Sequence, residues 1–316
     1  MAESLLDLTI IIPSYNTRDL LRACLQSIYR HTRDITFEVI CVDDASPDGS
    51  ADMVAAEFPD VLLVRNQTGQ YYAKNNNLGM RMSRARYACL LNSDTLLTSN
   101  AFAALVHFMD SHPDAAACGP KLLNPDGSIQ HCIRGFAGAA TFMLQAISWH
   151  RFFPRSKLMN RYYRTDFDYS REQIVESIGT TAYVVRRSTW ETAGMLDERF
   201  PHAMVDLAYN AMLLSKGCAV YYTPCAEVVH FGGQSINQLV LRSIRDQRDA
   251  FIRFNNYYDY FGGSRASKAL VRVGVWLRYY IKLMEYRFGS DKRVIKGPGA
   301  PPRAHNAGRS TNLGRS

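Results

Sequence analysis

The sequence lacks the glycine-rich loops with which many nucleotide-binding proteins hold phosphates. No Gly-x-Gly-x-x-Gly follows the first apolar run, and no Gly-Lys-Ser/Thr triplet occurs in the 316 residues. A dinucleotide fingerprint and a P-loop are therefore excluded. Nucleotide phosphates bound here would need a divalent cation instead, and carboxylates are its natural ligands.

Paired cysteines are also missing. The seven cysteines are odd in number and include no Cys-x-x-Cys pair. Cys24, Cys41 and Cys89 fall inside apolar patterns, where cysteine behaves as a small hydrophobic residue. This usage indicates a reducing compartment, with neither a disulfide framework nor a zinc site.

Long uncharged runs are absent as well. No window of about 18 residues is free of charge, so we expect no membrane-spanning helix. Acidic Glu3 and Asp7 precede the first apolar run, in place of the basic and then apolar pattern of a signal peptide. We therefore predict a cytoplasmic protein. Hydrophobic residues make up 47% of the chain, enough for a sizeable core.

Charge is distributed unevenly along the chain. From Arg242 to the end there are 16 Lys and Arg against 5 Asp and Glu, whereas the preceding residues hold 21 against 24. This asymmetry favours an anionic surface as the partner of the C-terminal quarter.

Apolar runs and helical patterns alternate through the first hundred residues. Strands are predicted at Leu8–Ile12, Phe37–Val42, Val61–Val64 and Tyr87–Leu91, with helices around residues 20–28, 50–58 and 73–83 between them. Short connections between alternating strands and helices predict an α/β fold with a doubly wound, mostly parallel sheet.

Polar residues follow three of these strands, at Ser14-Tyr15-Asn16, Asp43-Asp44 and Asn92-Ser93-Asp94. The carboxyl ends of parallel strands meet at one sheet edge, where open α/β folds bind ligands. We therefore predict a single cleft there, in which Asp94 could meet a cation. An ordinary turn residue is the alternative for Asp94 alone.

The second half is less regular. We predict a helix at 101–109, a turn at 124–127, a strand at 175–185, a capping-box helix from Ser188, a helix at 205–215, short strands at 220–222 and 228–229, and a helix at 239–254. Residues 137–170 are interpreted as a variable insertion over the cleft, and residues 289–316 as a disordered tail. His230 precedes two glycines and is a candidate metal ligand, with a locally hydrogen-bonded loop histidine as the alternative.

Residues 269–288 form a basic amphipathic pattern. Leu270, Val273, Leu277, Tyr280, Ile281 and Met284 share one side of the predicted helix, interrupted by arginines and a lysine. Such a helix can lie in a membrane interface. Packing on its own domain with solvated arginines is the alternative.

Six fragments resemble the inverting family-two glycosyltransferases of the GT-A fold, especially bacterial rhamnosyltransferase-like members. They are Ile-Ile-Pro-Ser-Tyr-Asn at 11–16, Val-Asp-Asp-Ala-Ser-Pro-Asp-Gly-Ser at 42–50, Asn76-Asn77-x-Gly79, Leu-Asn-Ser-Asp-Thr at 91–95, Leu-Asp-Glu-Arg-Phe at 196–200 and Val-Val-His-Phe-Gly-Gly-Gln-Ser at 228–235. Each fragment is weak alone, but six in the right order are specific.

The resemblance implies roles for residues in these fragments. Pro13 and Tyr15 would line the base pocket of a nucleotide-sugar, Asp43 or Asp44 would accept hydrogen bonds from base or ribose, and Asn76, Asn92 and Ser93 would complete the donor site. Asp94 and His230 match residues that hold Mg²⁺ or Mn²⁺. The ion would neutralise the leaving nucleoside diphosphate.

The resemblance also implies a general base. Relatives carry Glu-Asp-x-Asp-Leu after the Asp-Glu-Arg-Phe fragment, and its first Asp is the usual base. The matching positions here read Val205-Asp206-Leu207-Ala208-Tyr209, so Asp206 is kept while the two flanking acids are replaced. A helix-face aspartate without a catalytic role is the alternative.

These observations predict a metal-dependent inverting transferase acting on a UDP- or dTDP-sugar and a glycan or lipid-linked acceptor. The predicted transferase domain covers residues 1–238, with a nucleotide-sugar half at 1–120 and an acceptor half at 121–238. Basic helices at 239–288 would hold it at the inner face of the membrane. A catalytically inactive nucleotide-sugar-binding scaffold is the alternative. We expect no nucleic-acid partner, because the basic tail lacks a stacking or helix-turn-helix pattern.

Overall fold

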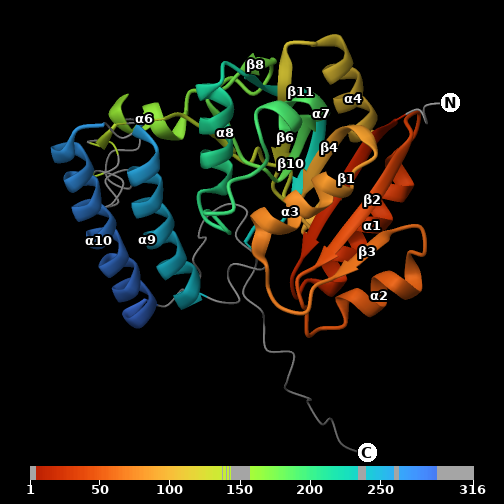
Figure 1. The fold of residues 1–316 in the computed structure, drawn as a ribbon, viewed down its shortest axis with the longest axis horizontal. Coiled ribbons are helices and arrows are strands. Elements are labelled where there is room, and N and C mark those ends of the chain that lie inside the picture. Colours follow the sequence, from red (N-terminus) through yellow and green to blue (C-terminus); the bar gives the residue numbers. More distant parts are fainter. Residues whose placement is uncertain are drawn as a thin grey trace, which may run out of the picture.

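The computed structural model describes residues 5–136, 157–233, 240–259 and 263–289, together with residues 138, 139, 141 and 143. Its centre is a nine-stranded sheet in the order β3-β2-β1-β4-β10-β6-β11-β5, with β8 paired to β11. Six of these strands run in one direction and three, β5, β8 and β10, in the other. The predicted α/β fold with a mostly parallel sheet is therefore confirmed (Figure 1).

The first half follows the predicted alternation closely. Its elements are β1 (Leu6–Ser14), α1 (Arg18–His31), β2 (Phe37–Asp43), α2 (Ser50–Glu57), β3 (Leu62–Arg65), α3 (Tyr71–Met82), β4 (Ala85–Leu91), β5 (Thr95–Leu97) and α4 (Ala101–Ser111). The central apolar residues of β1, β2 and β4 are buried, because both faces of the sheet are covered.

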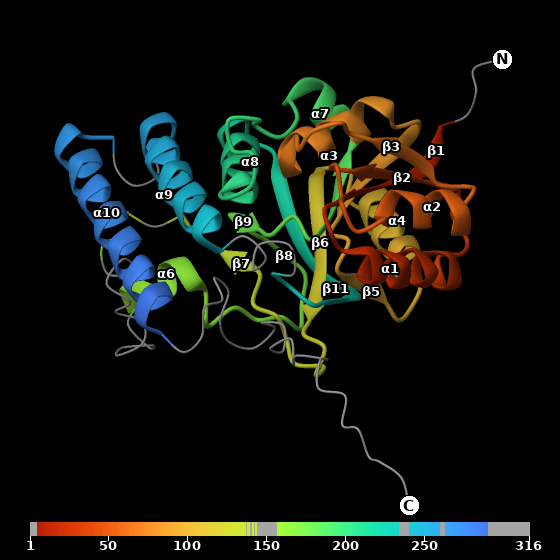
Figure 2. The same ribbon diagram turned by 90° about the horizontal axis from the view of Figure 1, so that it is seen from below.

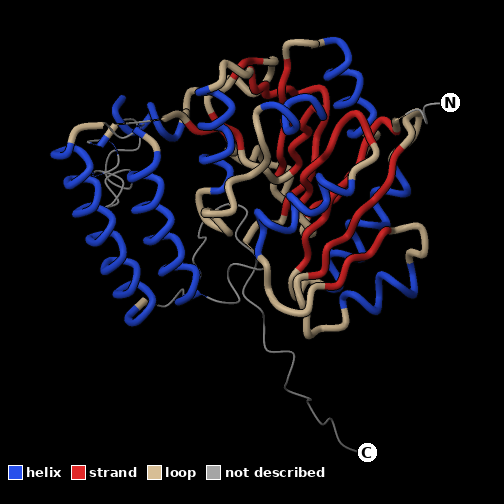
Figure 3. Tube along the Cα trace, in the orientation of Figure 1, coloured by secondary structure: helices blue, strands red, loops and turns tan. Residues whose placement is uncertain are grey.

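Helices cover both faces of this sheet. α1, α2 and α4 pack on one face around Leu25, Phe102 and Leu105. α3, α7 (Arg187–Thr192) and α8 (Val205–Ser215) pack on the other. Strands thus form an inner layer flanked by helices (Figures 2 and 3).

The C-terminal helices α9 (Val240–Tyr257) and α10 (Arg265–Phe288) lie side by side at the end of the molecule remote from β3 (Figures 1 and 2). Phe254, Val271 and Val275 join them to the core of the α3 face. Among the described residues, no helix combines the length and apolar character needed to cross a membrane. Apart from Gly289, the predicted disordered tail lies outside the described residues.

The prediction of one strand at 175–185 is wrong. This stretch contains β9 (Ser177–Ile178), which pairs with β7 (Ile133–Arg134), and most of β10 (Ala182–Arg186), while β8 (Gln173–Ile174) comes before it. The loop 179–181 separates the pieces and turns the chain into the centre of the sheet. An apolar pattern indicates strand-forming residues but does not reveal which partner each segment joins.

Three further details of the second half complete the comparison with the predicted elements. The strands predicted at 220–222 and 228–229 are one strand, β11 (Ala219–His230), with an irregular register between Thr223 and Glu227. The helix α7 begins at Arg187 directly after β10 and has no side-chain cap, so the predicted capping box at Ser188 is wrong. α6 (Lys157–Tyr163) lies within the stretch interpreted as an insertion, of which residues 137, 140, 142 and 144–156 lie outside the described residues.

Sequence patterns missed the central strand β6 (Ala115–Leu123), which lies between β10 and β11. Its alanines, glycine and proline have low strand propensity. Tertiary packing explains the glycine, because a Cβ atom on Gly119 would lie 2.5 Å from Cδ1 of Ile178. Close approach between two segments therefore selected the small residue at this position.

Candidate functional site

A cleft of about 610 Å³ opens at the carboxyl edge of β1, β2 and β4. Its walls come from the ends of these strands, the loop 179–181, the start of α8 and the start of α9. The lining residues are Pro13, Ser14, Tyr15, Asp44, Ala45, Gly69, Tyr71, Tyr72, Asn75, Asn92, Ser93, Asp94, Gly179, Thr180, Thr181, His202, Val205, Asp206, Gly233, Arg242, Ser243 and Asp246. The strand ends meet here as the parallel pattern predicts.

Seven of the residues predicted to form the site line this cleft: Pro13, Tyr15, Asp44, Asn92, Ser93, Asp94 and Asp206. His230 lies at its edge, in contact with Asp94. Asp43 and Asn76 are not among the lining residues. Asp43 is buried and accepts a hydrogen bond from the backbone of Ser46, which closes the turn after β2.

The paired asparagines of α3 hold the helix in place. Asn76 is fully buried and donates to the carbonyl of Tyr72. Asn77 exchanges two hydrogen bonds with the backbone of Leu196. Asn75, which no sequence pattern singled out, is the asparagine of α3 that lines the cleft. A donor-binding role for Asn76 stays a prediction.

Asp44 fixes the loop that leads into α3. Its Oδ1 accepts hydrogen bonds from the backbone of Gln70 at 2.7 Å and from Nδ2 of Asn66 at 3.0 Å, and its Oδ2 accepts one from the backbone of Tyr71 at 3.0 Å. Tyr71 adopts a left-handed backbone conformation with φ of 68°. Several hydrogen bonds to the one carboxyl group of Asp44 compensate such strain and hold Tyr71 at the cleft.

Asp94 and His230 face each other across the β5–β11 pairing. Nε2 of His230 lies 3.2 Å from Oδ1 of Asp94 and 3.3 Å from Nδ2 of Asn92. Their side chains are only 12% and 10% exposed, so water is largely excluded around the pair. A carboxylate oxygen and an imidazole nitrogen aimed at one point suit a divalent cation such as Mn²⁺.

The protein alone supplies few ligands at this point. Within the described part of the chain, no group of three His, Cys, Asp or Glu side chains comes together that could hold a metal ion. Asp94 and His230 therefore fit only a cation whose remaining ligands would be supplied by a bound diphosphate and by water, as Mg²⁺ commonly prefers.

Asp206 occupies the first turn of α8, after Met204 in a left-handed conformation with φ of 65°. Its Oδ1 accepts the backbone N–H of Leu207 at 2.8 Å, and burial raises the pKa of its carboxyl. Val205 lines the cleft beside it, whereas Ala208 is fully buried in the core. The second acid of the usual motif is therefore replaced at a position that faces packed side chains.

α9 forms a wall of the cleft that sequence reasoning missed. Arg242, Ser243 and Asp246 line it, and the guanidinium of Arg242 lies 4.9 Å from the ring centre of Tyr71. The centre of the Tyr71 ring also lies 6.0 Å from the centre of the His202 ring. The i, i+4 spacing of Arg242 and Asp246 was a readable helix signal, but only the tertiary structure turns this face toward the strand ends.

A family model for glycosyl transferase family 2 matches residues 9–184. The chain belongs to this family. The matched region runs from β1 into β10 and contains all the predicted donor residues, while Asp206 and His230 lie beyond it. The arrangement is that of a GT-A glycosyltransferase of the rhamnosyltransferase-like kind.

Similar proteins agree with the family-2 assignment. The chain is 25% identical to the O-antigen biosynthesis protein RfbC of Myxococcus xanthus over 229 residues, which cover 70% of this chain but only 17% of that protein. It is 26% identical to the N-acetylglucosaminyl-diphospho-decaprenol L-rhamnosyltransferase of Mycobacterium tuberculosis, over 62% of this chain and 67% of the relative. The solved mannosyltransferase PcManGT of Pyrobaculum calidifontis shares the fold, with a TM-score of 0.54 and 16% identity over 92% of this chain and 77% of that one.

Proposed function

We propose that this family-2 chain is an inverting transferase that moves a sugar from a UDP- or dTDP-sugar to a hydroxyl of a glycan or lipid-linked acceptor. One observation carries the proposal: a single cleft at the sheet edge is lined by both Asp94, beside His230, and Asp206. The names of the Myxococcus and Mycobacterium relatives, one in O-antigen biosynthesis and one with a diphospho-decaprenol acceptor, support a role in cell-surface polysaccharide synthesis.

Donor binding would use the strand ends. Pro13 and Tyr15 would line the base pocket, Asn92 and Ser93 would approach the sugar and phosphates, and Asp43 or Asp44 would complete the base or ribose contacts. Asp94 and His230 would hold Mg²⁺ or Mn²⁺. When bound, the ion would stabilise the charge on the leaving diphosphate. The Pyrobaculum mannosyltransferase, solved in complex with GDP-Man and Mn²⁺, supports a divalent cation in this role.

Asp206 would act as the general base. Its carboxylate would accept the proton of the acceptor hydroxyl while that oxygen forms a bond to the anomeric carbon. The bond from that carbon to the diphosphate oxygen breaks on the opposite face, so the anomeric configuration inverts. Burial raises the pKa of Asp206, which makes its carboxylate a stronger base than an exposed one.

Ligand-dependent melting of the full chain tests the donor site. UDP, dTDP, GDP and their sugars would be added with and without Mn²⁺, and the family-2 site should give metal-dependent stabilisation by a UDP- or dTDP-sugar. Asp94→Ala should lose the metal-dependent part. Near-normal turnover by that variant would contradict the metal assignment. Donor binding by the wild type without transfer to any acceptor extract would favour the inactive scaffold.

We further propose that the transferase domain comprises residues 1–238 and that helices 239–288 place it at the inner face of a membrane. α10 buries Val271, Gly274 and Val275, yet its opposite side is apolar and exposed. The exposed fractions there are 45% for Leu270, 61% for Val273, 40% for Leu277, 58% for Tyr280 and 57% for Met284.

Charge supports an anionic lipid surface as the occupant of this side. Arg287 is exposed at the end of α10 near the apolar stripe, and such helices bind anionic lipids through buried apolar area and electrostatic attraction. Arg248 of α9 stacks on Trp276 and Tyr279 of α10, at 4.8 and 4.7 Å. Because α9 also lines the cleft, a bound membrane would bring a lipid-linked acceptor close to it.

Sedimentation with vesicles tests the membrane contact. Phosphatidylglycerol vesicles should sediment the full chain, and phosphatidylcholine vesicles should do so weakly. The variant L277S/Y280S should lose sedimentation, while L62S/I174S, which removes exposed apolar side chains elsewhere, should keep it. Self-association in solution abolished by L277S/Y280S, without lipid binding by the wild type, would assign the stripe to a second copy instead. Salt-sensitive RNA binding lost on removal of residues 289–316 would contradict the absence of a nucleic-acid partner.

A further inference from the structure

A chain of hydrogen bonds leads from the predicted turn at 124–127 to the ring of His230. It starts at Asp126, whose Oδ1 lies 2.6 Å from Oγ of Ser128 and 3.0 Å from the backbone nitrogen of Ser128. These bonds lower the pKa of Asp126, so its carboxylate is ionised and can only accept. The hydroxyl of Ser128 must therefore donate to Asp126.

The direction of the next two bonds follows from the first. Because the hydroxyl proton of Ser128 points to Asp126, Oγ of Ser128 accepts from Nδ2 of Asn124 at 2.9 Å. Oδ1 of the buried Asn124 then faces Nε2 of Gln130, also at 2.9 Å, and accepts from it. The same Nε2 donates to the backbone carbonyl of His230 at 3.2 Å. Two acceptors thus fix the amide orientation of Gln130 independently.

The carbonyl end of Gln130 consequently faces the imidazole. Its Oε1 lies 2.6 Å from Nδ1 of His230 and can only accept, so Nδ1 carries a proton. With its Nδ1 proton directed to Gln130, the ring turns Nε2 toward Oδ1 of Asp94 at 3.2 Å and Nδ2 of Asn92 at 3.3 Å. An unprotonated Nε2 and a carboxylate oxygen this close repel each other unless a cation lies between them.

We propose that Gln130 is a positioning residue that accepts Nδ1–H of His230 and thereby keeps Nε2 as a cation ligand beside Asp94. This inference rests on the metal site of the proposed function. Ligating histidines generally donate their other ring N–H to a fixed oxygen, and that bond sets the tautomer and ring orientation. The turn at 124–128 has no catalytic role in the proposed function. In this inference it anchors the series of hydrogen bonds that ends at His230.

Nitrogen NMR of the metal-free full chain tests the tautomer directly. Histidine ring nitrogens would be labelled and recorded at pH 8, with His230 assigned by comparison with His230→Asn. The wild type should show a protonated Nδ1 and an unprotonated Nε2. Gln130→Leu should shift the population toward the Nε2–H tautomer, because that proton can then donate to Asp94. A wild-type ring protonated at Nε2 alone would overturn the inference.

Binding of Mn²⁺ in the presence of UDP, followed by electron paramagnetic resonance, tests the consequence. Gln130→Leu should weaken Mn²⁺ affinity by about 10- to 100-fold. Gln130→Glu keeps an acceptor for Nδ1–H and should recover most of that loss. Gln173→Leu removes a side-chain amide that donates to the carbonyl of Asp168, so it should bind Mn²⁺ as the wild type does.

The outcomes separate the two proposals. Wild-type Mn²⁺ affinity in a folded Gln130→Leu protein, judged by its melting transition, would overturn the positioning role. A wild type that shows the Nδ1–H tautomer but binds no Mn²⁺ would overturn the metal site of the proposed function and still support the tautomer assignment.

Discussion

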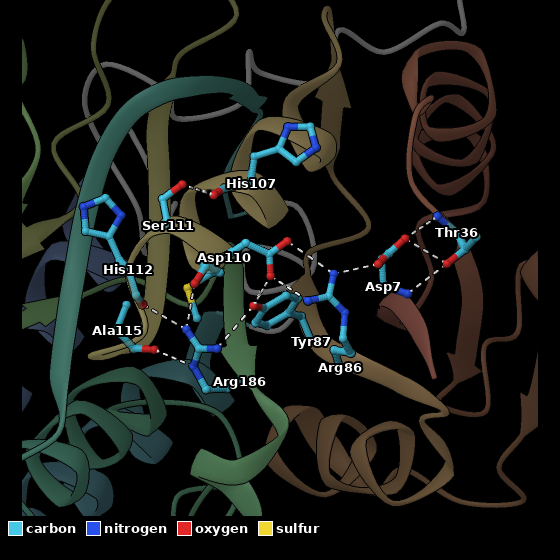
Figure 4. A network of polar contacts seen from close by, with 11 residues as sticks. Asp7, Thr36, Arg86, Tyr87, His107, Asp110, Ser111, His112, Ala115 and Arg186 are labelled. Atoms are coloured by element: carbon cyan, nitrogen blue, oxygen red, sulfur yellow. Dashed lines mark hydrogen bonds and ion pairs between the residues drawn. The ribbon is translucent and has the colours of Figure 1, made fainter. Parts of the chain in front are cut away.

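The two edges of the central sheet both carry aspartates, but these acids have different partners. At the amino edge, Arg86 joins Asp7 and Asp110, with distances of 2.7 and 2.6 Å, and Tyr87 donates to Asp110 at 2.7 Å (Figure 4). Arg186 continues this network through the hydroxyl of Tyr87 and three backbone carbonyls. Hydrogen bonds from Arg86 are the main reason why the pKa of Asp110 is lowered.

At the carboxyl edge the acids meet weaker donors. Asp44 accepts from backbone amides and Asn66, Asp94 faces His230, and Asp206 accepts from the amide of Leu207. Burial raises the pKa of Asp206, opposite to the shift at Asp110. The same residue type therefore stabilises the amino edge through ion pairs and lines a cleft at the carboxyl edge, where the proposed function assigns it chemistry.

Among the substitutions that test this difference between the two edges, the largest expected effect is on the rate of sugar transfer. Asp206→Asn should lower kcat by about 10²- to 10⁴-fold, because the acceptor hydroxyl loses its base. Donor binding should persist, since the proposed donor contacts come from the strand ends. Single-turnover kinetics and donor titration separate these quantities. A variant that transfers sugar at the wild-type rate would leave Asp206 as an ordinary helix residue.

The raised pKa of Asp206 gives signs for two pH dependences. Transfer should fall with decreasing pH through a midpoint above the ordinary value of about 3.9, because the base becomes protonated. Folding stability shows the opposite sign: the folded state binds the proton more tightly, so stability decreases as pH rises between the unfolded and folded pKa. Asp206→Asn should therefore melt no lower than the wild type at pH 7, and a lower melting temperature would contradict this account.

At the amino edge the loss should appear in stability instead. Arg186→Met removes the donors of the carbonyls of Met109, His112 and Ala115 and should lower the free energy of unfolding by about 2 kcal/mol. Urea denaturation measures this change, and nucleotide affinity should stay at the wild-type value. Arg171→Met, which breaks an exposed pair with Asp168, serves as the control and should cost less than about 0.5 kcal/mol.

The smallest effect concerns Asp110. Its ion pair with Arg86 is 39–40% exposed on both sides, so solvent screening limits the contribution to about 1 kcal/mol or less. A lowered pKa means that this stability is present above the unfolded value and is lost as pH falls through the folded one. Asp110→Asn should therefore be less stable than the wild type at pH 7 and nearly equal at pH 2. A pH-independent difference would assign the effect to packing.

Local sequence determined the first half of the fold and much of the site. Continuous apolar runs produce buried strands, and polar residues directly after them mark the sheet edge, so Tyr15, Asp44 and Asp94 were placed in the cleft from the sequence. Pro13 and Asp206 followed from the resemblance to the family. These signals act over a few residues, which is why periodicity and motif order could read them.

Tertiary structure decided the remainder. Glycine stands at position 119 of β6 where Ile178 packs against it, and no local sequence pattern reveals that contact. α9 became a wall of the cleft, and Asn75 rather than Asn76 lines it, because helix orientation depends on packing against distant segments. Gln130 contacts His230, which lies 100 positions further along the sequence, for the same reason. Contacts between residues far apart in the chain arise only when the core forms, so the sequence names the chemical groups while the fold decides which of them meet.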